Sequence, residues 1–176
     1  EYVDATLGQA YYWRAYSYYY LVTTWGRVPM VLKDAVEYNM PLAEVEDIYD
    51  LIVKDLNNAE NMLPDNYVNE PYARNGINIA VNKASAKATL SYVYMTMAGW
   101  PLNLGTEYYK LAAQKAKEVI DGVKNGTWNY RLLDEYKQVY SMEWNDKNPE
   151  VLLGLHYSLA SGALTNAVVC DFMQDM

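Results

Sequence analysis

Among the residue types that could catalyse hydrolysis, carboxylates are abundant in this sequence, whereas histidine and cysteine are scarce. The sequence has 22 acidic residues, one histidine (His156) and one cysteine (Cys170). A glycosidase needs two carboxylates held across a cleft. In a chain this acidic some pair always exists, and the spacing places carboxylates such as Asp55, Glu118 and Asp121 on polar helix faces. We therefore interpret them as solvent-exposed charges rather than as a catalytic pair.

The other catalytic constellations lack partners. A Ser-His-Asp triad would have to use His156, which lies inside an apparent strand next to Tyr157 and is better explained by packing. Cys170 has no neighbouring histidine to activate its thiol. A zinc site needs several Cys or His ligands, and neither glycine-rich phosphate motif occurs. The sequence predicts no catalytic residue, no metal, no cofactor and no enzyme activity.

The composition narrows the class of protein. The net charge of −8 argues against nucleic-acid binding, which needs a clustered basic surface. Nineteen Tyr, five Trp and a single Phe provide rings with polar tips, which suit half-exposed packing and the recognition of polar ligands. No apolar run is long enough to span a bilayer. The 176 residues fit one domain, 1–176, and because the chain begins at Glu1 we expect a segment of a longer protein.

Hydrophobic spacing predicts a mainly α-helical chain. Apolar residues at three- and four-residue intervals predict helices at about 4–24, 44–63, 82–98 and 106–124, with a short fifth helix at 133–140. Gly26 and Pro29 end the first helix, Asn82 is the expected N-cap of the third, and Gly122 or Gly126 is expected to help end the fourth.

The expected apolar stripes are Leu7, Tyr11, Ala15, Tyr18, Val22 and Trp25 on the first helix and Val45, Ile48, Ile52, Leu56, Ala59 and Leu63 on the second. Further tyrosines widen the aromatic surface of the first helix, which is therefore expected to be buried on more than one side. The third helix carries small residues on one face, which lets another helix approach closely. A second face of the third helix carries Leu90, Val93, Tyr94 and Met97, and residues 65–81 are expected to form a loop. An imperfect alternation at about 150–157 predicts a short β element near the C-terminus.

The order of these elements indicates a repeat. The chain is expected to form two successive antiparallel helical hairpins, in the order helix, connection, helix, loop, helix, turn, helix. Tyr109, Ala112, Ala116 and Val119 match the second helix of a tetratricopeptide unit, and Ala59 with Pro64 matches the end of one. The match to the tetratricopeptide pattern is incomplete. The spacing alone therefore supports tetratricopeptide-like hairpins and leaves α-hairpins of other kinds open.

Four segments in this order resemble the SusD/RagB family. Residues 13–29 resemble its signature, an aromatic helix with Leu-Arg-Ala near its start and an aromatic-Gly-Asp-Val-Pro exit. Residues 47–64, 83–99 and 107–121 are similar to the next three helices, and residues 148–155 to the strand that follows. Trp13 replaces the usual Leu, and Arg27 stands where Asp is common. The resemblance covers about residues 5–158.

This resemblance implies a tetratricopeptide-like SusD core within an outward-facing lipoprotein of the bacterial outer membrane. Its partners would be a TonB-dependent (SusC-like) transporter barrel and an oligo- or polysaccharide ligand, with peptides as the ligand of some members. The resemblance also implies that loops outside this core build most of the glycan site. A tetratricopeptide-like scaffold for protein–protein interaction is the alternative function.

Tryptophans are the candidate sugar contacts, because the apolar face of a pyranose stacks on an aromatic ring. Trp144 lies in a polar stretch, and Trp100 lies at a helix exit beside Pro101. Packing is the competing interpretation for both, and for Trp25 and Trp100 closure of a hairpin end is the favoured one. Trp144 and Trp100 are therefore the ligand-binding candidates.

Overall fold

The computed structural model of the chain describes residues 2–33, 38–68, 72–74, 77–78, 80–141 and 148–153. Its α-helices are α1 (Tyr2–Trp25), α2 (Val45–Met62), α3 (Lys83–Ala98) and α4 (Thr106–Lys124). A two-stranded antiparallel ladder, β1 (Ala73–Arg74) with β2 (Ile77–Asn78), precedes α3, and a 3₁₀ helix, η1 (Tyr136–Tyr140), follows α4. The mainly α-helical fold expected from the sequence is confirmed, and the four long helices begin and end within two residues of their predicted bounds.

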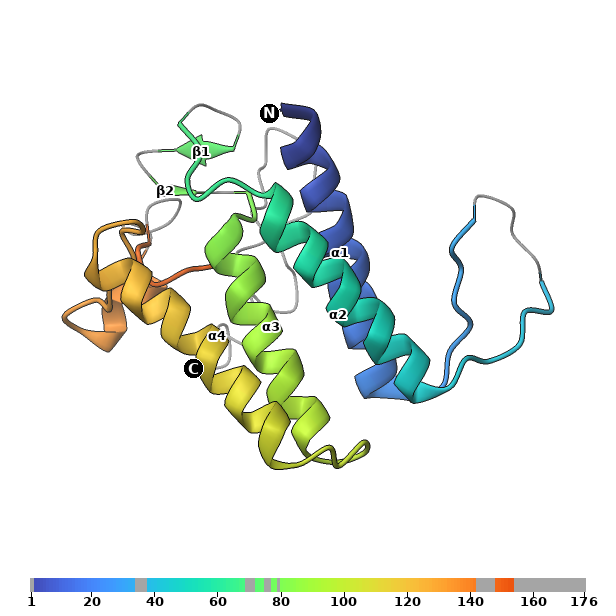
Figure 1. Ribbon diagram of the computed structural model, residues 1–176. Helices are drawn as coiled ribbons and strands as arrows, with labels where there is room; N and C mark the ends of the chain where they lie inside the picture. The colour runs from blue at the N-terminus through green and yellow to red at the C-terminus, as the bar shows by residue number, and fades with distance from the viewer. Residues whose placement is uncertain are drawn as a thin grey trace, which may run out of the picture.

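The helices pack in chain order. In Figure 1, α1 and α2 form one antiparallel hairpin, α3 and α4 form the next, and α2 packs against α3 to join them. As a result α1 and α3 run in the same direction. None of the helices that the structure describes has the length and apolarity needed to cross a membrane.

The apolar stripe of α2 forms the centre of the core. Five of its predicted positions are fully buried, namely Ile48, Ile52, Leu56, Ala59 and Leu63. From α3, the predicted face of Leu90, Val93, Tyr94 and Met97 is buried against the same core. Because a stripe at this spacing covers one side of a helix, α2 buries apolar side chains where α1 and α3 meet it.

The buried positions of α1 differ in part from the predicted stripe. Ala15, Tyr18 and Val22 are buried as expected, but the fully buried ring is Tyr12 rather than Tyr11. The phenol of Tyr12 is within hydrogen-bonding distance of the Thr89 hydroxyl on α3, at 2.9 Å. Helix α1 therefore has two packing faces, one toward α2 and one toward α3, as its aromatic composition predicted.

Local capping explains where the helices end and begin. Gly26 adopts φ +71°, a conformation that glycine takes without a Cβ penalty, and its N–H donates to the Val22 carbonyl at 2.9 Å. Asn82 is the predicted N-cap of α3: its side-chain oxygen accepts from the Ser85 N–H at 3.0 Å. Its side-chain N–H₂ also donates to Tyr130 and to the Asp65 carbonyl, which ties the flanking loops to the helix.

The connections differ from the expected elements at three places. Residues 65–81, expected to be a loop, contain the short β1–β2 ladder. The helix expected at 133–140 is a single 3₁₀ turn at Tyr136–Tyr140. The β element expected at 150–157 is not shown: residues 150–153 are not in a strand, and residues 154–157 lie outside the described residues. At Glu150 the side chain accepts from the Leu133 N–H, so a side chain rather than a neighbouring strand satisfies that backbone donor.

Candidate functional site

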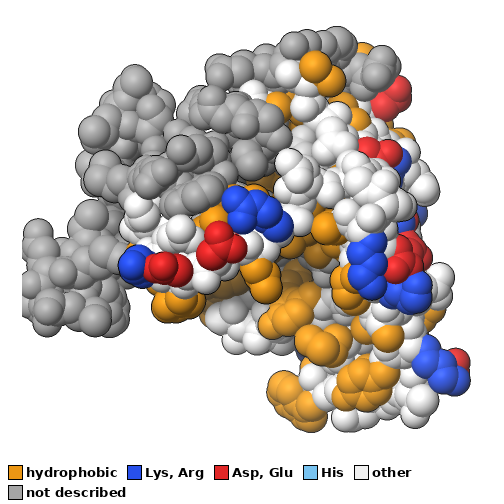
Figure 2. Space-filling model, turned by 90° about the vertical axis from the view of Figure 1, so that its left-hand side faces the viewer, with side chains coloured by type: hydrophobic (Ala, Val, Ile, Leu, Met, Phe, Trp, Pro, Cys, Tyr) orange, Lys and Arg blue, Asp and Glu red, His pale blue; other side chains and the backbone are white. Residues whose placement is uncertain are grey.

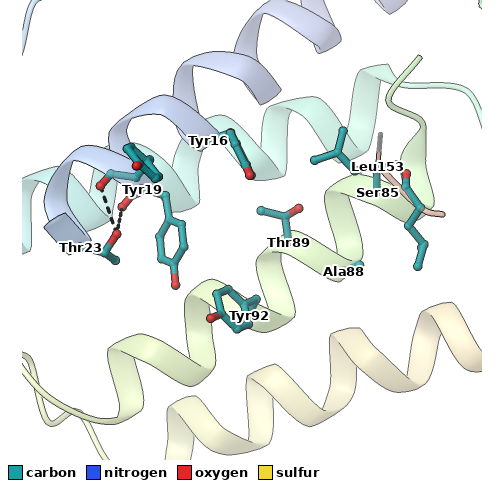
Figure 3. A pocket seen from close by; sticks show the side chains of 10 residues that line it. Tyr16, Tyr19, Thr23, Ser85, Ala88, Thr89, Tyr92 and Leu153 are labelled. Carbon is teal, nitrogen blue, oxygen red and sulfur yellow. Dashed lines mark hydrogen bonds between the residues drawn. The ribbon is translucent and has the colours of Figure 1, made fainter. Parts of the chain in front are cut away.

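A cleft with a volume of about 360 Å³ lies between α1 and α3, and we refer to it as the α1–α3 cleft. Figure 3 shows side chains from the two helices facing each other across it. Its lining residues are Tyr16, Tyr19, Tyr20 and Thr23 from α1, Ser85, Ala88, Thr89 and Tyr92 from α3, and Leu152 and Leu153 from the segment that follows η1.

The spacing of these residues explains why they meet. On each helix the lining positions follow the pattern i, i+3, i+4 and i+7, which places four side chains on one face. Because α1 and α3 run in the same direction and both pack on α2, these two faces lie side by side. The sequence signal was present on α1, where the extra tyrosines widened the aromatic surface. On α3 the signal was weaker, because Thr89 and Tyr92 follow no apolar stripe.

Tyrosine hydroxyls bridge the two helices at the base of the cleft. Tyr12 reaches Thr89, and Tyr19 reaches the Thr96 hydroxyl at 2.8 Å. The Tyr19 ring also meets the Tyr92 ring edge to face, with centroids 5.7 Å apart. Burial raises the pKa of Tyr12 to about 12 and raises that of Tyr19 above its ordinary value. The phenols therefore stay protonated at neutral pH and act as hydrogen-bonding spacers between the helices.

One end of the cleft is occupied by the chain itself. Leu152 and Leu153 lie beside Ser85, as Figure 3 shows for Leu153. The Ser85 hydroxyl donates to the Leu152 carbonyl at 2.5 Å, so the cleft wall satisfies a backbone acceptor of the entering segment. Leu153 also packs against the hydrophobic core.

The chemistry of the cleft is that of a binding surface. None of its described lining residues carries a carboxylate, an amine, a guanidinium, an imidazole or a thiol. The Thr23 hydroxyl donates back to the Tyr19 carbonyl at 2.7 Å, so even this wall hydroxyl is used within the helix. Among the described residues, every buried side-chain nitrogen or oxygen has a hydrogen-bond partner. The cleft thus presents aromatic rings, methyl groups and tyrosine and threonine hydroxyls, with no charged group among its described lining residues.

One carboxylate assigned to a polar surface is buried instead. The Asp55 side chain is only 1% exposed and receives two hydrogen bonds from Arg14, from Nε at 2.6 Å and from Nη2 at 2.8 Å. These hydrogen bonds raise the pKa of Arg14 above its ordinary value. The solvent-exposed interpretation of Asp55 was wrong, because an i, i+4 pattern cannot show that a cation on another helix will reach it. The pair joins α1 to α2 and serves packing rather than catalysis.

A second set of charges joins the two hairpins. Lys115 of α4 donates to Glu60 of α2 at 2.7 Å, and Lys87 of α3 donates to Glu60 at 2.8 Å and also contacts Glu118. Burial lowers the pKa of Lys87, but the hydrogen bonds to Glu118 and Glu60 outweigh it, so this pKa lies above its ordinary value. Burial raises the pKa of Glu118, yet Lys87 and Lys115 lower it below the ordinary range. These shifts follow from ion pairing across helices.

The described part of the chain contains no group of three or more His, Cys, Asp or Glu side chains arranged to hold a metal ion. Of the two sequence-predicted binding residues, Trp144 lies outside the described residues, as do His156 and Cys170. Trp100 is described and lies at the turn between α3 and α4, away from the residues that line the α1–α3 cleft.

Trp100 and Trp25 were expected to close hairpin ends, but both side chains are largely exposed. Their side chains are 83% and 63% exposed, and Trp25 meets only the edge of the Tyr20 ring in the aromatic contacts of the described residues. Figure 2 shows hydrophobic side chains gathered toward the lower end of the face it views, the end where Figure 1 places the α3–α4 turn. Helix ends at this turn are closed by backbone hydrogen bonds, such as Gly105 N–H to Ala98 O at 3.0 Å, which leaves the Trp100 ring available for contact.

Two successive antiparallel helical hairpins place this chain in the class of mainly α-helical, tetratricopeptide-like folds. Residues 1–95 match the SusD-like family described as "Starch-binding associating with outer membrane". That match covers more than half of the chain, and the chain therefore belongs to the SusD-like family.

Individual relatives agree with this assignment. SusD-like protein P2 of Formosa agariphila is 27% identical over 159 residues, which cover 88% of this chain and 28% of that protein. A SusD superfamily protein of Parabacteroides distasonis is 29% identical with a TM-score of 0.74, over 90% of this chain and 31% of that one. A protein solved with a xylogluco-oligosaccharide is 25% identical with a TM-score of 0.73, over 88% and 30%. The chain thus spans less than a third of the length of these relatives.

Proposed function

We propose that this chain is the helical core of a longer, outward-facing lipoprotein of the bacterial outer membrane that captures glycans and delivers them to a TonB-dependent, SusC-like transporter barrel. The observation that carries the proposal is the SusD-like family match over residues 1–95. The similar structure solved with a xylogluco-oligosaccharide supports a carbohydrate ligand. In this proposal the core acts as a binding scaffold and not as an enzyme, which the lining of the α1–α3 cleft supports, since none of its described lining residues carries a carboxylate.

The packing of this core supports a scaffold role within that protein. Ion pairs link α1 to α2 and link α2 to both helices of the second hairpin, so the four helices are fixed relative to one another. A fixed frame of this kind positions loops that carry a binding site. Trp144 and Trp100 are the residues of this chain that we propose for sugar contact, with most contacts supplied by chain outside it.

Isothermal titration calorimetry of the intact protein against a panel of neutral oligosaccharides, including xylogluco-oligosaccharides, tests the proposal. We expect heat of binding for at least one of them, and a weaker affinity in Trp100→Ala. Trp25→Ala is the matched control, since Trp25 is also an exposed tryptophan at a helix end and is expected to leave the affinity unchanged. Absence of binding across the panel would contradict glycan capture.

A second function is favoured by one observation. The α1–α3 cleft is apolar, uncharged and open, which suits a polypeptide with apolar side chains. A peptide ligand or a protein–protein scaffold would use this surface. Binding of peptides, together with failure of every glycan in the panel, would select this alternative.

A further inference from the structure

We propose that the intact protein forms a weak two-fold dimer, in which α4 packs against α4 of a second copy in antiparallel orientation. The contact is a row of four side chains on α4, Tyr109, Ala113, Ala116 and Ile120, which we call the α4 seam. The inference rests on the exposure of the seam and on the charges beside it. It goes beyond the proposed function, because glycan binding does not require it.

The α4 seam is an apolar row that lies open to solvent. Its residues follow steps of four, three and four along the helix, so they lie on one side of it. Tyr109 and Ile120 are 51% and 53% exposed, Ala113 is exposed and Ala116 is half-buried. Helix α4 lies at the end of the row of helices in Figure 1 and packs on α3 through another side, where Ala112 is buried. The seam therefore has room for another helix.

The order of side-chain sizes along the seam is self-complementary. Large side chains stand at its two ends, and alanines stand between them. In an antiparallel pair Tyr109 of one copy meets Ile120 of the other, and Ala113 meets Ala116. The alanines in the middle allow the two backbones to approach closely. A parallel pair would instead place Tyr109 against Tyr109, with two large rings in the same layer.

The charges beside the seam favour the same antiparallel orientation. The side of α4 between the seam and solvent carries, in chain order, Glu107, Lys110, Gln114, Lys117, Asp121 and Lys124. In the register that the seam sets, Lys110 of one copy comes beside Asp121 of the other. Glu107 likewise comes beside Lys124, and two-fold symmetry repeats both contacts. A parallel pair would place each of these charges beside its own equivalent, like against like.

The present partners of these charges can be exchanged for partners on a second copy. Lys110 contacts Glu107, and Lys117 contacts Asp121, in exposed pairs along a single helix. Such pairs contribute little to stability, so giving them up costs little. One helix packed on another buries less surface than a stable dimer needs, so we expect association to be weak and concentration-dependent.

Complementary charge reversal in the intact protein tests the proposal. Sedimentation velocity at increasing concentration is expected to show a monomer–dimer equilibrium. Lys110→Glu alone and Asp121→Lys alone should each raise the dissociation constant at least about tenfold, because each places like charges beside one another twice. Lys54→Glu, the same charge change on the exposed side of α2, is the matched control and should leave the dissociation constant unchanged.

A mixture of the two seam variants gives the sharpest result. When Lys110→Glu copies meet Asp121→Lys copies, every contact between positions 110 and 121 joins opposite charges. We therefore expect the mixture to associate as a heterodimer, detected by native mass spectrometry, although neither variant dimerises well alone. A loss caused by misfolding of either variant would not be restored by mixing.

Thiol chemistry at the seam provides a second readout, with Cys170→Ser as the background. Ala113→Cys copies mixed with Ala116→Cys copies should form a disulfide-linked dimer at least about ten times faster than Leu111→Cys copies mixed with Ala116→Cys copies, since only the first pair meets across the seam. Leu111 lies on the opposite side of α4 from the seam.

Three results would overturn the proposal. The first is a monomer at every concentration. The second is association that both charge reversals leave unchanged, which would assign the dimer to another surface. The third is an Ala113→Cys thiol that a maleimide does not label in the dilute, monomeric protein, which would show that further chain of the same polypeptide covers the seam. Each of these results is independent of whether the protein binds glycans.

Discussion

Helices α2 and α4 are both the second helix of a hairpin and both carry an apolar stripe, yet they are buried to different extents. Helix α2 lies between α1 and α3 and buries six residues, including an aspartate. Helix α4 packs on α3 and buries only Ala112 and Gly122 in the described structure. Tyr109, which belongs to the predicted stripe of α4, is 51% exposed.

The difference shows what an apolar stripe can predict. Spacing identifies the face of a helix that can be buried, and it does so equally well for both helices. It does not identify the element that covers this face. On α2 the cover comes from two neighbouring helices, whereas on α4 it comes from one, so the same sequence pattern carries different amounts of stability.

The largest expected effect concerns the charge pair at the covered helix. Arg14→Ala leaves the Asp55 carboxylate, only 1% exposed, without its cation, and we expect a loss of about 3–5 kcal/mol in the free energy of unfolding. Urea denaturation followed by circular dichroism measures it. Lys117→Ala on α4 is the control, because its pair with Asp121 is exposed and its loss should leave the midpoint unchanged. Equal losses for the two variants would remove the distinction between the helices.

Truncating one isoleucine on each helix sharpens the comparison. Ile52→Ala on α2 removes a fully buried side chain and is expected to cost about 2–5 kcal/mol. Ile120→Ala on α4 removes one that is 53% exposed, and the expected cost is below about 0.5 kcal/mol in the 176-residue chain. Repeating both in the intact protein would show whether further chain covers α4, in which case the loss at Ile120 would approach that at Ile52.

Alkaline pH tests the packing of α1. Tyr12 has a folded-state pKa of about 12 against an ordinary value of 10.0, so the folded state holds the phenolic proton more tightly. The contribution of Tyr12 to the free energy of unfolding is fully present below pH 10. It is lost as the pH rises from 10 to 12, by about 2–3 kcal/mol in total. Stability measured by denaturation at pH 9 to 12 should fall less steeply in Tyr12→Phe. An unchanged slope would show that Tyr12 is not the group responsible.

The smallest expected effect lies at the end of α4. A Cβ built at Gly122 would be 2.2 Å from Cζ3 of Trp128, so Gly122→Ala forces the indole to move and should cost about 1–3 kcal/mol. Thermal unfolding measures this cost. In a Trp128→Ala background the same substitution should be neutral or stabilising, because the obstructing ring is gone. A cost that persists in that background would place the strain elsewhere.

Much of the fold could be predicted because each helix carries its own signals. Gly26 and Asn82 mark helix ends through backbone conformation and capping, both of which depend on nearby residues. The stripe of α2 was correct because one helix face suffices to define it. Gly122 or Gly126 was expected to help end the fourth helix. The structure places Gly126, at φ +83°, just beyond the end of α4, whereas Gly122 provides the space that admits Trp128, six positions further along the chain.

The candidate site could not be predicted from such local signals. Asp55 is buried on α2 and paired with Arg14 of α1, and Tyr12 is buried on α1 with its hydroxyl beside Thr89 of α3. The α1–α3 cleft likewise depends on two helices that are distant in the sequence but run side by side. Each of these features follows from packing between elements, which residue spacing within one element does not encode.

Native affinity electrophoresis in gels containing soluble polysaccharides, with the intact protein and the 176-residue chain in adjacent lanes, tests the central claim that this chain is the scaffold of a glycan-binding protein. We predict that the intact protein is retarded by at least one polysaccharide and that the 176-residue chain alone is not. Equal retardation of both would contradict the account, because the sugar site would then lie within these helices, with Trp100 the first residue to replace.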